Sequence, residues 1–374
     1  MKTKINWAIL APGIIANSMA QAMNSVCKDG KINLYAVASR NKERSEEFAK
    51  KWNFQKAYGS YQELFEDSQV DAIYIANPHA FHFVSVMQAL QNGKHILCEK
   101  PAGCSMDQLS QMINLAKEKN LFFMEAMWTA FNPCIAQIKK EIAQGAIGEV
   151  KHIESRFCNR IPYDPDNRLY APYLAGGALL DLGIYNIYFA MMINDFSPIA
   201  SRNSSVRLLD GVDIWNSVNL TFENGVTTSF QSAADMPAGS NTHDATIFGT
   251  KGFITVENFF MTQKAAIHTY KSEWGNDNEI TKEIDVPFMT NGYEYELIHA
   301  TECILNNLKE SPVHTFEKSI PRFLRPPDRW SKFPSSRYSQ AGSAQRQHLF
   351  PSVSFVPTSH VQMFFGFLLV LVMP

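Results

Sequence analysis

The stretch K-I-N-W-A-I-L-A-P-G-I-I-A-N-S-M-A, residues 4–20, decides the fold of this chain. Its first part, Ile5–Leu10, is a run of apolar and β-prone residues that predicts a buried strand. A short turn follows, and the small and apolar residues of Ile14–Met23 predict a helix. A strand that turns directly into a helix leaves free N–H groups at the helix start, and these groups and the helix dipole favour a phosphate.

The turn between strand and helix, A-P-G-I-I-A, matches the dinucleotide fingerprint G-x-G-x-x-G/A in part. Gly13 is the central glycine, and Ala16 is an accepted variant at the packing position. Ala11 replaces the first glycine, so we expect a turn that tolerates a Cβ atom. A chance glycine after a strand gives the same pattern, so the interpretation depends on the rest of the chain. The residues expected to bind the cofactor here are Ala11, Pro12, Gly13, Ile14 and Ile15.

Composition restricts the class of protein. A chain of 374 residues predicts two domains, and 45% hydrophobic with 19% charged residues is typical of a soluble globular protein. The net charge of −2 argues against a nucleic-acid binder or a basic membrane-surface protein. The six cysteines form no C-x-x-C pair and no His or carboxylate cluster has metal spacing, so we expect neither zinc nor disulfides. With no signal-peptide pattern at the start, we expect a cytoplasmic protein.

The second predicted strand, Ile32–Ser39, indicates which cofactor is used. In a Rossmann unit this strand ends beside the adenine ribose, where an acidic residue would bind the 2′-hydroxyl of NAD. The chain has Ser39 and Arg40 instead, so no carboxylate repels a 2′-phosphate and the guanidinium of Arg40 can pair with it. We therefore predict NADP, with NAD as the alternative. Arg40 could also be a solvated residue at a helix start.

Strands and helices then alternate as far as residue 126, which predicts a parallel sheet with right-handed crossovers. Asn77 and Pro78 end the strand 71–76 at the edge where ligands of such sheets bind. His82 follows and could shape a nicotinamide pocket, although a hydrogen-bonded histidine at a helix start explains it as well. The further strands expected are 56–58, 95–99 and 121–126, and the helices are 42–52, 81–92 and 106–119.

The pattern changes after residue 126. A helix over 132–144 leads to a strand over 150–157, and the pair Gly176-Gly177 opens an apolar helix to Met192. From Ile199 to about Asp285 the pattern is one of strands, with a hairpin signal at Glu223-Asn224-Gly225. A helix over 293–308 follows. We predict a Rossmann domain over 1–126 and an α+β domain on a mostly antiparallel sheet over 127–320, and hence an α/β protein.

Five motifs now show a resemblance to a known family. They are A-P-G-I-I-A, G-K-H-I-L-C-E-K-P at 93–101, E-A-M-W at 125–128, G-A-I-G-E-V at 145–150 and G-G-A-L-L-D-L-G-I-Y at 176–185. In order and spacing the chain resembles the glucose–fructose oxidoreductase, inositol dehydrogenase and MocA family of NAD(P)-dependent oxidoreductases, over roughly residues 4–320. Within it, the final tyrosine makes the chain most similar to the dimeric dihydrodiol dehydrogenase group.

The resemblance assigns catalysis to Lys100 and Tyr185. Hydride transfer from an alcohol needs a group that takes the hydroxyl proton and a positive group that holds the developing alkoxide. Lys100 ends a strand at the ligand edge, where its ammonium can bind a hydroxyl and lower the pKa of a neighbour. Tyr185 is then the proton donor or acceptor, unless it is a core aromatic. Asp181, four residues earlier, faces the same side of the helix and could orient Lys100 or serve a structural role.

The remaining site predictions concern cofactor and substrate. Arg168, in the loop 158–175, could reach a substrate, and a solvated loop arginine is an equal alternative. The residues expected around the cofactor beyond the phosphate turn are Ser39, Arg40, Asn77, Pro78, His82, Glu99 and Lys100.

These residues predict an NADP-dependent dehydrogenase or reductase that acts on a sugar, a cyclic polyol or a dihydrodiol. The alternative is a non-catalytic dinucleotide-binding sensor of the same fold. A proton-transfer pair such as Lys100 and Tyr185 favours the enzyme. We expect a small-molecule sugar or polyol as partner, no nucleic acid, no membrane, and a homodimer or higher oligomer.

The tail, residues 321–374, departs from the family. After Ile320 we expect an amphipathic helix, but the chain is rich in Pro, Arg and Ser and ends in M-F-F-G-F-L-L-V-L-V-M-P. This apolar run is shorter than the ~18 residues that span a membrane. We interpret the tail as foreign to the fold, the product of a shifted reading frame, with a membrane anchor as the alternative.

Overall fold

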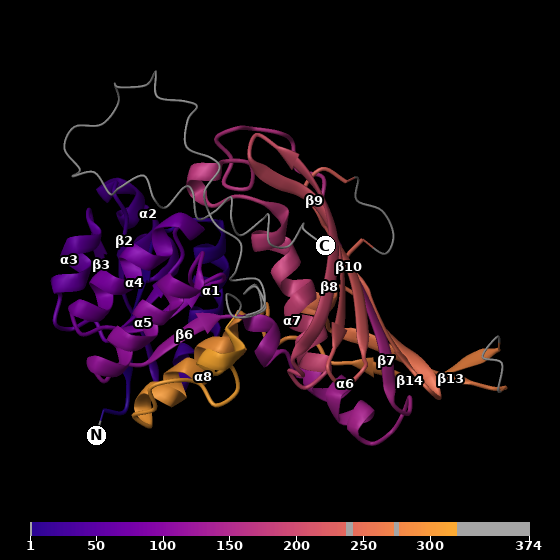
Figure 1. Cartoon of the computed structure of the whole chain (residues 1–374). Coiled ribbons are helices and arrows are strands. Elements are labelled where there is room, and N and C mark those ends of the chain that lie inside the picture. The colour runs from indigo at the N-terminus through magenta and orange to yellow at the C-terminus, as the bar shows by residue number, and fades with distance from the viewer. Residues whose placement is uncertain (1, 237–241, 273–276, 320–374) are drawn as a thin grey trace.

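A computed structural model describes residues 2–236, 242–272 and 277–319 of the chain. Two sheets organise these residues, one in each half of the sequence (Figure 1). The tail and the helix expected after Ile320 lie outside the described residues.

The first sheet has six parallel strands in the order β3-β2-β1-β4-β5-β6, which confirms the predicted Rossmann sheet. Because both faces are covered by helices, β4 is buried along its whole length and needs no polar face. The strands are β1 (Ile5–Leu10), β2 (Ile32–Ala38), β3 (Lys56–Tyr58), β4 (Ala72–Ile75), β5 (His95–Glu99) and β6 (Phe123–Ala126). The helices are α1 (Ile14–Val26), α2 (Lys42–Trp52), α3 (Tyr61–Glu66), α4 (His82–Gln91) and α5 (Met106–Glu118).

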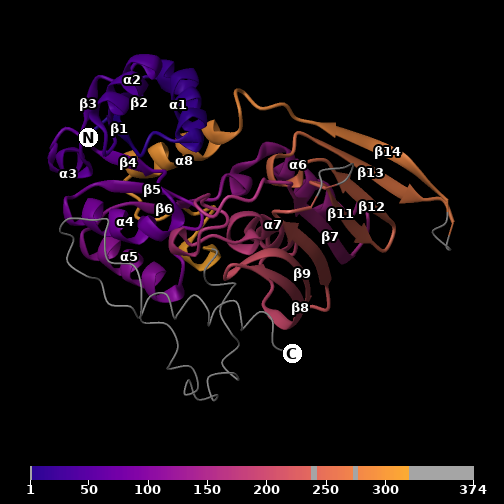
Figure 2. The same ribbon diagram turned by 90° about the horizontal axis from the view of Figure 1, so that it is seen from above.

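The helix α8 (Tyr293–Leu305) comes from the second half of the sequence but packs with the helices of the Rossmann sheet. It lies beside α1, as both views show (Figures 1 and 2). The indole Nε1 of Trp7 in β1 donates a hydrogen bond of 3.0 Å to Thr301 Oγ1 in α8, and the contact is buried. The chain thus crosses back from its second half to cover one face of the Rossmann sheet.

The second sheet has eight strands in the order β14-β13-β12-β11-β7-β10-β9-β8. Every pair is antiparallel except β7 with β10, so the predicted mostly antiparallel sheet is confirmed. The turn 223–225 joins β9 to β10 as the hairpin signal predicts. The strands are β7 (Val150–Cys158), β8 (Ile199–Leu209), β9 (Val212–Phe222), β10 (Thr227–Ala233), β11 (Ala245–Gly249), β12 (Gly252–Val256), β13 (Lys264–Tyr270) and β14 (Asn278–Asp285). Its helices are α6 (Pro133–Ala143) and α7 (Ile184–Ile193).

The apolar helix predicted to open at Gly176-Gly177 and to run to Met192 is present, but its first turn is not α-helical. It begins with a π-helical turn, η5 (Leu179–Gly183), and continues as α7. Asp213 in β9 holds this start, because its Oδ2 accepts a hydrogen bond of 2.8 Å from the Leu179 N–H. Gly177 has φ of +122°, and a Cβ atom there would collide with Asp213 Oδ1. The carboxylate of Asp213 thus needs a glycine beside the helix start.

The segment Pro172–Ile193 is long and apolar enough to cross a membrane by length and composition. Its most apolar window is completely buried inside the protein. Figure 1 shows α7 between the two sheets, where an apolar surface on all sides of a helix is what burial requires. The apolar character of this segment therefore follows from its place in the core.

Candidate functional site

The phosphate turn lies at the carboxyl end of β1. Gly13 is the N-cap residue of α1, and the first turn of that helix carries no acidic residue. A Cβ atom added at Gly13 would meet only one protein atom within reach, Ala11 O at 4.0 Å. Ala11 adopts φ of +70°, so the turn accommodates the Cβ in a conformation that favours glycine. Ile14 is 93% exposed beside this open space, where backbone N–H groups are available for a phosphate.

Two arginines follow β2: Arg40 lies between β2 and α2, and Arg44 lies in the first turn of α2. Arg40 is exposed, and Ser39 is buried, with its Oγ accepting a bond of 3.3 Å from the N–H of Asn41. Arg44 donates from Nη2 to Pro12 O at 3.1 Å, which links the start of α2 to the phosphate turn. Burial raises the pKa of Tyr61, and the positive charges of Arg40 and Arg44 lower it. Arg44 was not among the predicted residues, because its bond to the phosphate turn is a tertiary contact that the sequence does not show.

Asn77 and Pro78 follow β4 at the same edge of the sheet. Asn77 is 8% exposed and donates from Nδ2 to Ser85 Oγ at 2.8 Å, while its Oδ1 is buried with no hydrogen-bond partner among the described residues. Pro78 precedes the short helix η2 (His79–Phe81). An unpaired buried acceptor at the ligand edge is available to a donor of a bound molecule.

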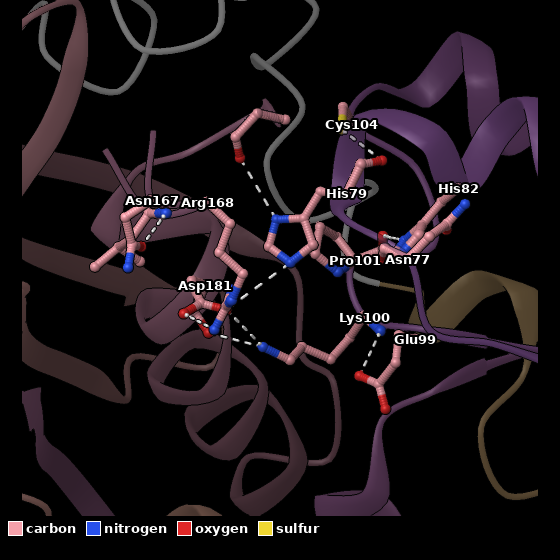
Figure 3. A network of polar contacts seen from close by, with 12 residues as sticks. Asn77, His79, His82, Glu99, Lys100, Pro101, Cys104, Asn167, Arg168 and Asp181 are labelled. Carbon is pink, nitrogen blue, oxygen red and sulfur yellow. Dashed lines mark hydrogen bonds and ion pairs between the residues drawn. The ribbon is translucent and has the colours of Figure 1, made fainter. Parts of the chain in front are cut away.

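His82 is completely buried behind this edge. Its Nδ1 lies 2.8 Å from Pro101 O, and its Nε2 lies 2.7 Å from Asn77 O. Burial lowers the pKa of this imidazole, while the two carbonyl groups raise it. The structure thus places His82 as a bridge between the ends of β4 and β5 (Figure 3). Its two contacts hold together the loops that follow these strands.

Lys100, directly after β5, crosses to the second half of the chain. Its ammonium donates to the backbone oxygen of Asp181 at 3.0 Å and to Asp181 Oδ1 at 3.1 Å (Figure 3). The preceding residue, Glu99, is buried, and its two oxygens accept from the Tyr74 hydroxyl and, at 3.3 Å, from the Lys100 N–H. Burial raises the pKa of Glu99, and the Lys100 charge lowers it.

Asp181 is the centre of the site. Besides Lys100, it accepts two bonds from Arg168, with Nη1 to Oδ1 at 2.8 Å and Nη2 to Oδ2 at 3.0 Å. His79 Nε2 lies 3.8 Å from Oδ1, and burial lowers the pKa of His79 to about 3, so this histidine is neutral. Although burial opposes ionisation of Asp181, Lys100 and Arg168 hold its pKa well below the usual range. Asp181 is therefore a carboxylate at neutral pH.

Tyr185 lies beside Lys100 on the same side of the helix as Asp181. The Lys100 ammonium is 4.7 Å from the centre of the Tyr185 ring, a cation–π contact with the ring face. Burial raises the pKa of Tyr185 well above its usual value, and the carboxylates of Glu99 and Asp181 raise it further. Burial and the two carboxylates outweigh the lowering of the Tyr185 pKa that we expected from Lys100. Tyr185 therefore carries its proton at neutral pH.

Trp128, in the E-A-M-W motif, also borders this region and was not predicted as a site residue. Its ring stacks on Tyr293 with centres 4.4 Å apart, and both Trp128 and Tyr185 pack against Phe260. The indole Nε1 is buried and interacts with the Tyr185 hydroxyl, whose pKa it lowers against the larger effect of burial. The sequence offers His79, together with His82, as a residue that could shape a nicotinamide pocket. The contact of His79 with Asp181 is visible only in the tertiary structure.

The arrangement combines a neutral phenol, a lysine ammonium, an arginine and a carboxylate at the edge of a dinucleotide-type sheet. Such a set can hold the oxygen of a substrate and give it a proton. Within residues 2–236, 242–272 and 277–319, no three His, Cys, Asp or Glu side chains gather as metal ligands would.

Comparison with known proteins identifies the family to which both halves of the chain are similar. Residues 5–127 match the oxidoreductase family with an NAD-binding Rossmann fold, and residues 135–255 match the GFO/IDH/MocA C-terminal domain. The chain is 35% identical over 321 residues to trans-1,2-dihydrobenzene-1,2-diol dehydrogenase of Xenopus laevis, covering 85% of this chain and 94% of the relative. The Mus musculus protein of the same name is 33% identical over 320 residues, with coverage of 83% and 91%.

Solved structures share the fold. A 3-ketoreductase from Actinomadura kijaniata in complex with NADP and TDP-benzene superposes with a TM-score of 0.74 at 23% identity. Levoglucosan dehydrogenase in complex with NADH and L-sorbose gives 0.75 at 20% identity. Each comparison covers 86% of this chain and 95% of the other. The chain therefore belongs to the glucose–fructose oxidoreductase, inositol dehydrogenase and MocA family of NAD(P)-binding oxidoreductases.

Proposed function

We propose that this protein is an NADP-dependent dehydrogenase or reductase that interconverts an alcohol and a carbonyl group on a sugar, a cyclic polyol or a dihydrodiol. The observation that carries the proposal is the meeting of Lys100, Asp181 and Tyr185 across the boundary between the two halves of the chain. A sensor has no use for a buried phenol that keeps its proton beside a fixed ammonium, so the enzyme is favoured over a non-catalytic binding protein.

Residues of the first half fit a nicotinamide dinucleotide. The open space at Gly13 and the free N–H groups of α1 suit its pyrophosphate, and the unpaired Asn77 Oδ1 suits a hydroxyl or amide donor. Arg40, with Arg44 beside it, suits a 2′-phosphate, which is the basis for proposing NADP rather than NAD. When bound, such a cofactor supplies a hydride to the substrate carbon or accepts one from it.

Residues of the protein then transfer the proton. In the direction of reduction, the Tyr185 hydroxyl gives its proton to the substrate oxygen while the Lys100 ammonium stabilises the negative charge that develops there. In the opposite direction, the Tyr185 oxygen takes the hydroxyl proton. Asp181 keeps Lys100 in place, and Arg168, 54% exposed in its side chain, has donors left for substrate hydroxyl groups.

A panel of sugars, cyclic polyols and dihydrodiols with NADP⁺ or NAD⁺, and of the matching carbonyl compounds with NADPH or NADH, tests the proposal. We expect a change in nicotinamide absorbance with at least one class of compound, and faster turnover with the phosphorylated cofactor. Tight cofactor binding without turnover of any compound would instead favour the non-catalytic protein.

We also propose a homodimer formed through the second sheet. The face of that sheet away from α6 and α7 is lined by side chains such as Glu154, Arg156 and Thr246, around a hollow of about 530 Å³. A broad open sheet face of this kind suits pairing with a second copy of the chain. Light scattering on the purified protein measures the mass of the assembly, and the mass of a single chain would contradict the proposal.

A further inference from the structure

A chain of hydrogen bonds with no exposed side chain runs behind the site. The Tyr188 hydroxyl lies 2.8 Å from His314 Nδ1, and His314 Nε2 lies 3.2 Å from Glu125 Oε2. Glu125 Oε1 accepts a bond of 2.8 Å from the N–H of Ala102. The side chains of His314 and Glu125 are 0% exposed, and Tyr188 is 1% exposed. We call Tyr188, His314 and Glu125 the buried chain.

The chemistry of these groups limits the directions of the bonds. A carboxylate only accepts, so both the Ala102 N–H and the His314 Nε2–H donate to Glu125. In the tautomer that carries its single proton on Nε2, Nδ1 accepts from the Tyr188 hydroxyl, so this tautomer satisfies both contacts of the imidazole. Since each group is buried, loss of one partner leaves another polar group unpaired.

The two ends of the buried chain lie next to the two proposed catalytic residues. Tyr188 follows Tyr185 by three residues on α7, and Ala102 follows Lys100 by two residues after β5. Lys100 contacts the helix turn of Asp181 and the ring of Tyr185 directly. The buried chain joins the same two segments by a second route, through β6 and the segment of His314.

We propose that Tyr188, His314 and Glu125 are positioning residues that set the placement of the Lys100–Ala102 turn against the helix of Tyr185. The inference rests on the proposed function for the roles of Lys100 and Tyr185. A buried polar network is often no more stable than apolar packing of the same volume, so its value lies in holding one geometry. Small displacements between a proton donor and an ammonium reduce turnover more than they reduce cofactor affinity.

Tyr188→Phe tests the inference, because it removes one hydroxyl and keeps the ring. We expect kcat to fall by about tenfold, the scale of one lost buried hydrogen bond, with the dissociation constant of NADPH nearly unchanged. Hydrogen exchange of the segment 100–104, measured by mass spectrometry with NADPH bound, should become faster. Tyr35→Phe is the matched control, because it removes the 3.1 Å hydrogen bond from a buried tyrosine of β2 to Asp67. This variant should change neither kcat nor the exchange rate of the segment 100–104.

A double variant separates positioning from loss of stability. If the buried chain acts through the placement of Tyr185, Tyr188→Phe should cost much less kcat in a Tyr185→Phe background than in the native chain. An equal loss of kcat in both backgrounds would overturn the inference. So would a hydrogen-exchange rate of the segment 100–104 in Tyr188→Phe that equals the native rate. If the native protein turns over no substrate, the proposed function fails, and the exchange measurement still decides whether the buried chain holds this turn.

Discussion

The ammonium nitrogen of Lys100 lies 3.1 Å from Oδ1 of Asp181, although the two residues are 81 positions apart in the sequence. Lys100 directly follows β5 of the Rossmann sheet, and Asp181 lies in the π-helical turn η5 that precedes α7. Their side chains are 11% and 6% exposed, so the pair is largely shielded from water. This contact joins the two halves of the protein at the point where we place the chemistry.

Asp181→Asn should destabilise the protein, because it leaves the Lys100 and Arg168 charges without their carboxylate. We expect a loss of roughly 3 kcal/mol in the free energy of unfolding at pH 7. The pKa of Asp181 is depressed in the folded state, so its contribution is present above the unfolded pKa and is lost as the pH falls below about 4. The difference between native and variant should therefore shrink at low pH in denaturant titrations. Asp195→Asn, which breaks an exposed pair with Lys139, is the control and should have little effect at either pH.

Tyr185→Phe removes the proposed transferable proton and keeps the ring on which the Lys100 ammonium lies. We expect kcat to fall on the order of 10²- to 10⁴-fold, while the affinity for NADPH stays nearly native. Because the pKa of Tyr185 is raised well above its usual value, kcat for reduction in the native enzyme should stay level from pH 7 to pH 9. Steady-state kinetics of the native enzyme and the variant across this pH range measures the loss of kcat and its pH dependence. Full kcat in the variant would remove Tyr185 from the mechanism.

Arg40→Asp should reverse the cofactor preference. The new carboxylate repels a 2′-phosphate and can bind a 2′-hydroxyl, so we expect NADPH to bind at least tenfold more weakly and NADH to bind no worse. Arg44→Ala should weaken NADPH binding as well, since Arg44 bonds the phosphate turn through Pro12 O. Fluorescence titration of both cofactors gives the dissociation constants. Equal constants for the two cofactors in the native protein would contradict the assignment of NADP.

Gly13→Val tests the phosphate turn. A Cβ atom at Gly13 meets only Ala11 O at 4.0 Å, so the protein itself has room for the first carbon of the new side chain. The branched side chain would instead occupy the space proposed for the pyrophosphate. We expect cofactor binding to be lost while the thermal midpoint without cofactor stays within a few degrees of native. Unchanged cofactor affinity would show that the phosphate site lies elsewhere.

The Rossmann half was predictable because its signals are local. A buried strand, a turn with Gly13 and a small-residue helix are read from consecutive residues, and the alternation that follows dictates a parallel sheet. The motifs around Lys100 and Tyr185 are also contiguous, so the family resemblance could be stated before any contact was known. The apolar helix after Gly176-Gly177 was also predictable, but its π-helical turn was not, since this turn depends on a hydrogen bond from the Leu179 N–H to Asp213, 34 residues further along.

The tertiary structure decided which side chains meet. Nothing in the sequence places Arg168 with two bonds on Asp181, or His79 beside it as a neutral imidazole, because these contacts depend on how loops and helices from different parts of the chain pack. The same holds for α8, which packs on the Rossmann sheet with contacts such as the bond from Trp7 to Thr301, two residues 294 positions apart. The sequence by itself determined the elements and the types of chemistry they carry. Burial and long-range packing determined the charge states, with Asp181 ionised and Tyr185 protonated, because both depend on neighbours that are distant in sequence.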